Sequence, residues 1–226
     1  MQPEYQYPYQ PPAAGYGVPP YGPPGLPLRS LRVPAALSVS GLIAYIVLGA
    51  IDLVVAQLAI HRTLSAPGSP EGGTGLVSDL VVLLKSLLIV AIAPTFIVWL
   101  FLVLKNLVMR GIRVWAPGWA IGGWFIPVAN LVLPALVVNG AVKGSNADSR
   151  RSGGTALVVI WWLLLLWGLL TGQAYIDHDY SPADEVSFIA GYNASANAPL
   201  IAAAALCIVI VRRVTRQHEA RVARGR

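Results

Sequence analysis

The stretch from residue 117 to residue 142 reads PGWAIGGWFIPVANLVLPALVVNGAV, and its behaviour decides the fold. It is as apolar as a membrane span, but Pro127 and Pro134 would each delete a hydrogen bond of a continuous helix. Asn130 lies between these two prolines. A straight helix is therefore disfavoured, and we expect two short helices around a break at residues 125–130. Irregular backbone at membrane depth must be buried in protein or line a cavity.

Four other apolar stretches are each close to the roughly 20 residues that a helix needs to cross a hydrocarbon core. Pro34 suits the first turn of the first helix, and Pro94 is expected to kink the second. The predicted fold is an all-α polytopic membrane helix bundle with four transmembrane helices and a re-entrant or interfacial hairpin at 117–142. The predicted membrane domain is 34–211, and its spans cover about 34–60, 80–104, 155–172 and 194–211.

The overall composition agrees with a membrane protein. Of the 226 residues, 56% are hydrophobic and only 12% are charged, whereas soluble domains carry about 25% charged residues. The net charge of +6 does not indicate nucleic-acid binding, because the basic residues flank apolar spans and form no stripe with interleaved aromatic residues.

The positions of lysine and arginine decide whether residues 117–142 cross the bilayer. Cytoplasmic loops of membrane proteins carry an excess of these residues. With four spans and a hairpin that returns to its own side, Arg62 and Lys85 are the only two of the 16 basic residues that lie elsewhere than in the cytoplasm. With five spans, the basic residues at 143–151 and the arginine-rich C-terminus would lie outside. The charges therefore predict four spans with both termini in the cytoplasm.

The two ends of the chain differ from the spans in composition. Residues 1–28 are rich in proline, tyrosine and glycine, which predicts a disordered cytoplasmic tail with local polyproline II character. This tail could dock a cytoplasmic protein partner or could be a flexible leader without a specific ligand. Residues 212–226 form a basic cytoplasmic C-terminus, which we expect to lie against the anionic headgroups of membrane lipids.

A run of aromatic residues, prolines and asparagines follows the second half of the second span. It contains FIVWL at 96–100, PGWAIGGWFIP at 117–127 and NL at 130–131. Together these motifs resemble the bacterial domain of unknown function 4328 family of small membrane proteins. The resemblance implies a multi-pass protein of the bacterial inner (cytoplasmic) membrane, without an established activity. The residues that carry it are Trp99, Asn106, Pro117, Trp119, Trp124, Pro127, Asn130 and Pro134.

Two ionisable residues lie inside the predicted spans, Asp52 in the first and Lys85 in the second. Such residues are costly in a membrane and are candidates for a function. Because the two spans are sequential and antiparallel, we predict that Asp52 and Lys85 form a pair. The pair could be a structural clamp or a proton- or cation-responsive site. Alternatively, Lys85 could snorkel outward while Asp52 stays protonated.

The break at residues 125–130 also has two interpretations. It could be a ligand or ion site with Asn130 as its side-chain participant, because broken helices expose backbone carbonyls and helix ends. It could instead be a packing hairpin, in which Asn130 or Asn106 satisfies the carbonyls that the prolines free.

No phosphate loop, nucleotide fingerprint or catalytic arrangement is recognisable in the sequence. We therefore expect a protein that is not an enzyme and that has no cofactor, metal site or nucleic-acid partner. The first functional hypothesis is a structural or protein-interaction component of the membrane. The second is a small transporter or channel subunit that uses Asp52, Lys85 and the hairpin.

Overall fold

The computed structural model of the protein describes residues 28–65, 74–146, 153–176 and 191–224. Within these residues every regular element is helical, and no strand occurs. The predicted N-terminal tail, apart from Leu28, lies outside the described residues.

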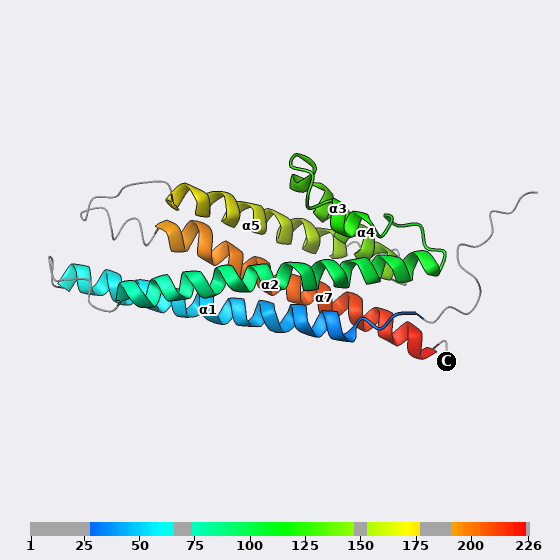
Figure 1. Ribbon diagram of the computed structural model, residues 1–226, viewed down its shortest axis with the longest axis horizontal. Helices are drawn as coiled ribbons and strands as arrows, with labels where there is room; N and C mark the ends of the chain where they lie inside the picture. Colours follow the sequence, from blue (N-terminus) through cyan, green and yellow to red (C-terminus); the bar gives the residue numbers. More distant parts are fainter. Residues whose placement is uncertain (1–27, 66–73, 147–152, 177–190, 225–226) are drawn as a thin grey trace, which may run out of the picture.

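Four long helices form the body of the molecule (Figure 1). Helix α1 spans Arg32–Ser65, α2 spans Thr74–Met109, α5 spans Gly153–Ile176 and α7 spans Ala198–Arg224. All four are long and apolar enough to cross a membrane. The prediction of an all-α bundle with four candidate membrane spans is therefore confirmed.

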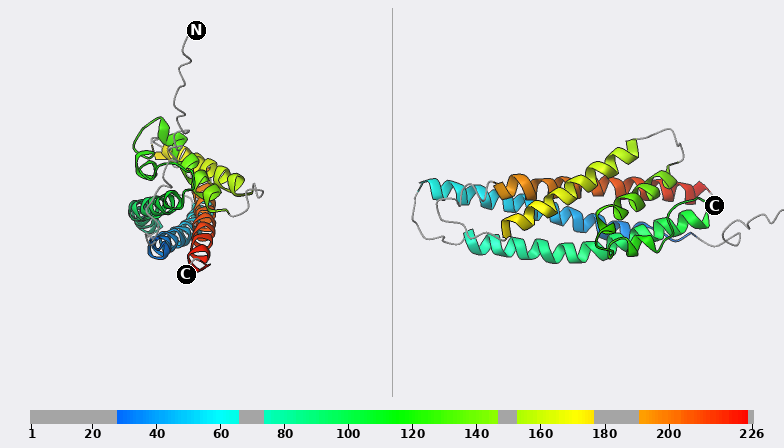
Figure 2. Two further views of the ribbon diagram at one scale, coloured as in Figure 1. Left: turned by 90° about the vertical axis from the view of Figure 1, so that its right-hand side faces the viewer. Right: turned by 90° about the horizontal axis from the view of Figure 1, so that it is seen from above.

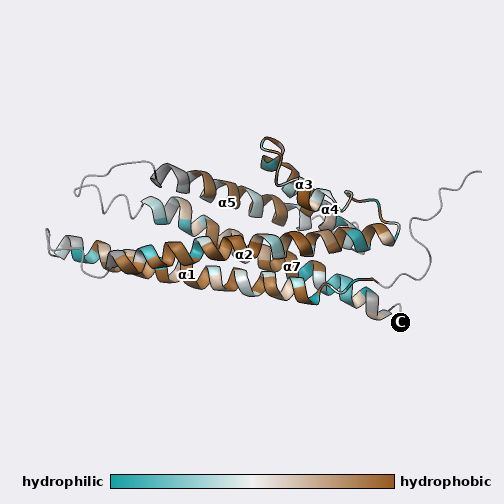
Figure 3. Cartoon of the chain, in the orientation of Figure 1, coloured by the Kyte–Doolittle hydropathy of each residue, from teal (hydrophilic) through white to brown (hydrophobic). Residues whose placement is uncertain are grey.

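The helices extend beyond the apolar stretches from which they were predicted. At about 1.5 Å per residue, α1 and α2 are longer than the roughly 30 Å of a hydrocarbon core. Helix α2 continues through Pro94 without ending. Helix α7 likewise continues past residue 211, so most of the predicted basic C-terminus is the last part of this helix. Figure 3 shows the hydrophilic colour of that part against the largely apolar colour of the middle of the bundle.

Helix α1 packs against α2 and α7, and α7 also packs against α5. Figure 2 shows the same bundle end on and from above. The side chains that face away from these contacts are largely apolar, and Val33, Leu76 and Val90 are 69%, 78% and 72% exposed. A helix that is apolar around most of its circumference suits a membrane span. The structure therefore agrees with a membrane protein in its surface as well as in its length.

The segment between α2 and α5 folds as a broken hairpin. It contains the short helix α3 (Trp119–Gly122), a 3-10 turn η1 (Ala129–Leu131) and helix α4 (Leu133–Ser145). Pro134 lies in the first turn of α4, where its missing N–H costs no helical hydrogen bond. Helix α2 ends and α5 begins at the same end of the bundle (Figure 1). The hairpin therefore leaves and returns at one end, and the start of α1 and the end of α7 lie there too.

Candidate functional site

The two ionisable residues predicted to pair are brought together in the structure. Lys85 Nζ of α2 donates a hydrogen bond to Asp52 Oδ2 of α1 over 2.9 Å. Both residues are buried, with exposed fractions of 6% and 5%. The Lys85 ammonium also lies 5.8 Å from the centre of the Tyr45 ring, which is within the range of a cation–π contact.

An asparagine that the sequence analysis did not single out completes this site. Asn197 Oδ1 accepts a second hydrogen bond from Lys85 Nζ over 2.9 Å. Asn197 Nδ2 lies 3.3 Å from Asp52 Oδ2, 3.4 Å from the Gly49 carbonyl oxygen and 3.1 Å from Asn193 Oδ1. Asn197 is fully buried. We call Asp52, Lys85 and Asn197 the intramembrane triad.

A short π-helical turn, Asn193–Asn197, positions the asparagine of the triad directly before α7. Turns of this kind are rare in proteins overall, but those that occur are often found at functional sites. Thr171 of α5 stabilises the turn, because its Oγ1 lies 2.7 Å from the Ser195 carbonyl oxygen. No signal in the sequence marks a π-helical turn, and Asn197 carries no charge that would draw attention to it.

Glycine allows the helices around the triad to approach closely. A Cβ atom on Gly49 would lie 2.8 Å from Ile201 of α7, and one on Gly168 of α5 would lie 3.0 Å from the Ala196 carbonyl oxygen. Real Cβ atoms essentially never come as near as the first of these distances. Close approach of backbones at small residues is a common mode of packing between membrane helices.

A second polar cluster lies at the other end of the bundle. Asn106 Nδ2 donates a hydrogen bond to the Arg29 carbonyl oxygen over 2.8 Å and lies 3.0 Å from His218 Nε2. Asn106 Oδ1 accepts from the Arg29 backbone N–H over 3.1 Å. Glu219 accepts hydrogen bonds from the Leu31 backbone N–H and from Arg32 Nε. We call Arg29, Asn106, His218 and Glu219 the terminal clasp.

The terminal clasp corrects one interpretation of the sequence. Asn106 and His218 are buried, with exposed fractions of 0% and 3%. The Asn106 amide bonds to the backbone just before α1 and to His218 near the end of α7. The hypothesis that it satisfies carbonyls of the hairpin is therefore wrong. His218 was missed because its partner is more than a hundred residues away in the chain.

Aromatic side chains join the hairpin to the long helices. Trp124 packs edge-on against Phe96 of α2 and Trp162 of α5, with ring centres 6.4 Å and 5.9 Å apart. Phe96 also contacts Trp99, whose indole N–H donates a hydrogen bond to Thr215 of α7.

The tip of the hairpin is attached to α5 through its backbone. Trp162 Nε1 donates a hydrogen bond to the Leu131 carbonyl oxygen over 2.8 Å. The tip residues Phe125, Pro127 and Val128 are exposed, and Asn130 is half-buried. Near the other end of the hairpin, Trp119 packs edge-on against Trp115, with ring centres 6.1 Å apart.

One family model, described as Domain of unknown function (DUF4328), matches residues 73–216. The chain belongs to the DUF4328 family. This membership confirms the resemblance inferred from the tryptophan, proline and asparagine motifs. No curated protein and no solved structure matches the chain.

The motif residues of this DUF4328 protein do not form one site. Trp99 and Trp124 both pack against Phe96, whereas Asn106 belongs to the terminal clasp. Pro127 and Asn130 lie at the hairpin tip. The matched region contains Lys85 and Asn197 of the triad, while Asp52 lies in α1 before it.

The chemistry available to the triad is that of a closed ion pair. The carboxylate, the ammonium and the amide of the triad bond to one another. Among the residues that the structure describes, no group of three or more His, Cys, Asp or Glu side chains could hold a metal ion.

Proposed function

We propose that this DUF4328 protein is a structural and protein-interaction component of the bacterial inner membrane, with both termini in the cytoplasm and without enzymatic activity. The observation that carries this proposal is the closed intramembrane triad. Separating a buried ion pair leaves an uncompensated charge, which is costly. The Asp52–Lys85 pair therefore stabilises the packing of α1 against α2. The amide of Asn197 extends this connection to α7. A site that satisfies its own charges suits a rigid support better than a moving gate.

The proposed orientation rests on the distribution of charge. Arginine and lysine gather at the end of the bundle where α1 begins and α7 ends, and cytoplasmic ends of membrane proteins carry this excess. The last part of α7 would lie against anionic lipid headgroups there, and each basic residue near such a surface contributes about 1 kcal/mol.

We also propose that the hairpin is re-entrant. The Leu131 carbonyl at its tip is bonded to Trp162, which lies close to the middle of the candidate span Gly154–Gly172 of α5. The exposed fractions of Phe125 and Val128 are 75% and 80%, and apolar side chains of this size favour a lipid environment over water.

The proposed interaction role centres on residues 1–28. The terminal clasp holds Arg29 and Leu31 against α2 and α7, so the tail would leave the bundle from a fixed point. A proline- and tyrosine-rich segment presented in this way could bind a cytoplasmic protein.

One observation favours a second function, that of a small transporter or channel subunit. The π-helical turn at Asn193–Asn197 lies directly against the ion pair, and such turns are frequent at functional sites. If the turn relaxed, Asn197 would release Lys85 and the triad would open.

The test compares three proteins expressed at matched levels in membranes: the full chain, a chain in which a glycine–serine linker of equal length replaces residues 1–28, and the variant Asp52→Leu/Lys85→Leu. Neighbouring proteins are quantified by proximity labelling, and ion or proton uptake is measured in vesicles. The interaction role predicts that the linker chain loses specific neighbours and that the double variant retains them. Uptake by the full chain that disappears in the double variant would establish the transport role instead.

A further inference from the structure

The sharp turn after α2 leads into the segment that connects α2 to α3, and this connection lies directly on α4. Gly111 has φ +73°, a backbone conformation that other residues rarely adopt, and it reverses the chain after Met109. A Cβ atom on Gly140 would lie 2.8 Å from Trp115 Cδ1, and one on Gly144 would lie 2.8 Å from Val114 Cγ1. The two glycines of α4 therefore leave the space that the side chains of the connection occupy.

An open cleft of about 600 Å3 lies between the connection and α4. Its lining consists of Arg113, Val114, Trp115, Ala116, Gly140, Lys143 and Gly144. Close packing against glycine fixes the position of its walls, so the cleft does not depend on the tip of the hairpin.

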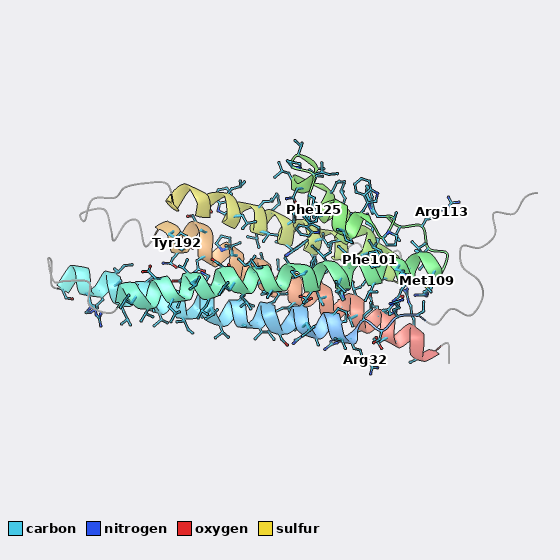
Figure 4. All side chains as sticks on the ribbon, in the orientation of Figure 1. Arg32, Phe101, Met109, Arg113, Phe125 and Tyr192 are labelled. Atoms are coloured by element: carbon cyan, nitrogen blue, oxygen red, sulfur yellow. The ribbon has the colours of Figure 1, made fainter. Side chains whose placement is uncertain are left out.

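The cleft is positively charged. Arg113 and Lys143 are exposed, and neither forms an ion pair with another described residue. No aspartate or glutamate occurs in the sequence from residue 80 to residue 147, so neither wall contributes a negative charge. Figure 4 shows the Arg113 side chain extending away from the bundle at this end. A guanidinium and an ammonium beside one cleft are the groups that bind phosphate in proteins.

The surroundings of the cleft suit a lipid better than a soluble phosphate. Trp115 forms one wall, and tryptophan is enriched at the level of lipid headgroups. Exposed apolar side chains occur on both helices of the hairpin, and Ile121 of α3 and Leu136 of α4 are 46% and 42% exposed. Basic pockets between helices on the cytoplasmic side of a membrane bind the headgroups of anionic lipids.

We propose that this cleft binds the phosphate of an anionic phospholipid. Arg113 and Lys143 contact the phosphate, Trp115 lies beside the glycerol region, and the acyl chains follow the apolar surface of the hairpin. The cleft is separate from the intramembrane triad and from the basic end of α7, so it goes beyond the proposed interaction role.

The test uses the full chain purified in detergent and titrated with defined lipids, with binding measured by native mass spectrometry. The probes are phosphatidylglycerol, phosphatidylcholine and glycerol 3-phosphate. A basic residue near a lipid surface contributes about fivefold in affinity, so Arg113→Gln/Lys143→Gln is expected to weaken phosphatidylglycerol binding about thirtyfold. The matched control is Lys105→Gln/Arg110→Gln, which removes the same charge from the same end of the bundle but outside the cleft.

The proposal is supported if phosphatidylglycerol binds more tightly than phosphatidylcholine and only the cleft variant loses this preference. It is overturned if the cleft variant binds like the unaltered chain, or if the control weakens binding equally, because the attraction would then be general. It is also overturned if glycerol 3-phosphate displaces the lipid at equal concentration, because the ligand would then be a soluble phosphate.

Discussion

The ammonium group of Lys85 has three donors, and in this bundle two acceptors meet it inside the apolar span. Asp52 supplies a charged oxygen and Asn197 a neutral one, each at 2.9 Å. A lysine deprived of water is costly unless such partners replace the lost hydration. The ion pair and the amide are thus interdependent, because the removal of any one member leaves another buried at low dielectric without its partner.

This interdependence predicts unequal costs for single and double substitutions. Lys85→Leu leaves the Asp52 carboxylate buried without its charged partner and is expected to destabilise the fold by about 3–5 kcal/mol. Asp52→Leu/Lys85→Leu removes both charges and is expected to cost distinctly less. Unfolding in detergent with increasing denaturant measures both values.

A matched substitution on the surface of the same helix controls for the effect of leucine itself. Ser86→Leu lies beside Lys85 but is exposed, so it is expected to change stability little. A double variant that is less stable than Lys85→Leu would show that the pair does not act as a closed unit.

The terminal clasp also makes a prediction at the level of one residue. Asn106→Leu removes the two hydrogen bonds to Arg29 and leaves the buried His218 ring without this partner, at a cost of about 1–3 kcal/mol. Amide hydrogen exchange at residues 29–31 is expected to become faster, while exchange in α5 stays the same. Equal acceleration in both segments would mean that Asn106 supports the whole fold and not the start of α1.

At the scale of helices, two glycines of α5 that are one turn apart face α7 and the π-helical turn before it. A Cβ atom on Gly168 would lie 2.6 Å from Leu200 Cγ, whereas one on Gly172 would lie 3.7 Å from Ala196 Cβ. Gly168→Ala is therefore expected to destabilise the bundle by about 1–3 kcal/mol through overpacking. Gly172→Ala serves as its control and is expected to leave the melting temperature unchanged or slightly higher. Equal melting temperatures for the two variants would contradict the close contact.

The position of the hairpin can be tested with cysteine labelling. The native chain has a single cysteine, Cys207, which is buried, so the background is low. If the tip is re-entrant, Val128→Cys is expected to react slowly with a membrane-impermeant maleimide in inside-out vesicles, although Val128 is 80% exposed in the structure. Arg113→Cys is the reactive control at the basic end. Equal labelling rates at the two positions would place the tip in water.

The elements of this fold differ in how far the sequence could predict them. The four spans were predictable because long apolar runs without charges have few alternatives, and the broken hairpin because prolines interrupt a helix at known places. The π-helical turn was not predictable, since it depends on contacts with Thr171 of another helix. Helix ends were also missed, because polar residues such as those of α7 can extend a helix beyond the apolar core.

The same distinction applies to the candidate site. Asp52 and Lys85 were identified because a charge within an apolar span is conspicuous. Asn197 and His218 were not, because an uncharged amide and a histidine near basic residues have many possible environments. Their roles arise from partners on other helices, Lys85 and Asn106, and become visible only in three dimensions.

For the whole molecule, the arrangement of the helices predicts its topology in the membrane. A reporter fused after residue 148 and another fused after residue 226 are both expected to report a cytoplasmic location, because the hairpin returns to the end at which it began. A fusion within residues 66–73, between α1 and α2, is the control and is expected to report the opposite side. A reporter after residue 148 on the outer side would mean that the hairpin crosses the bilayer.

The π-helical turn at 193–197 determines the direction, around the helix axis, in which each later residue of α7 points. Such a turn accommodates one residue more than an α-helical turn, and each residue of an α-helix advances about 100° around the axis. Removing one residue there would rotate Thr215, Gln217 and His218 together and separate each from its partner on another element. The extra residue of the π-helical turn before α7 therefore determines whether the side chains at the other end of this helix face their partners in the bundle.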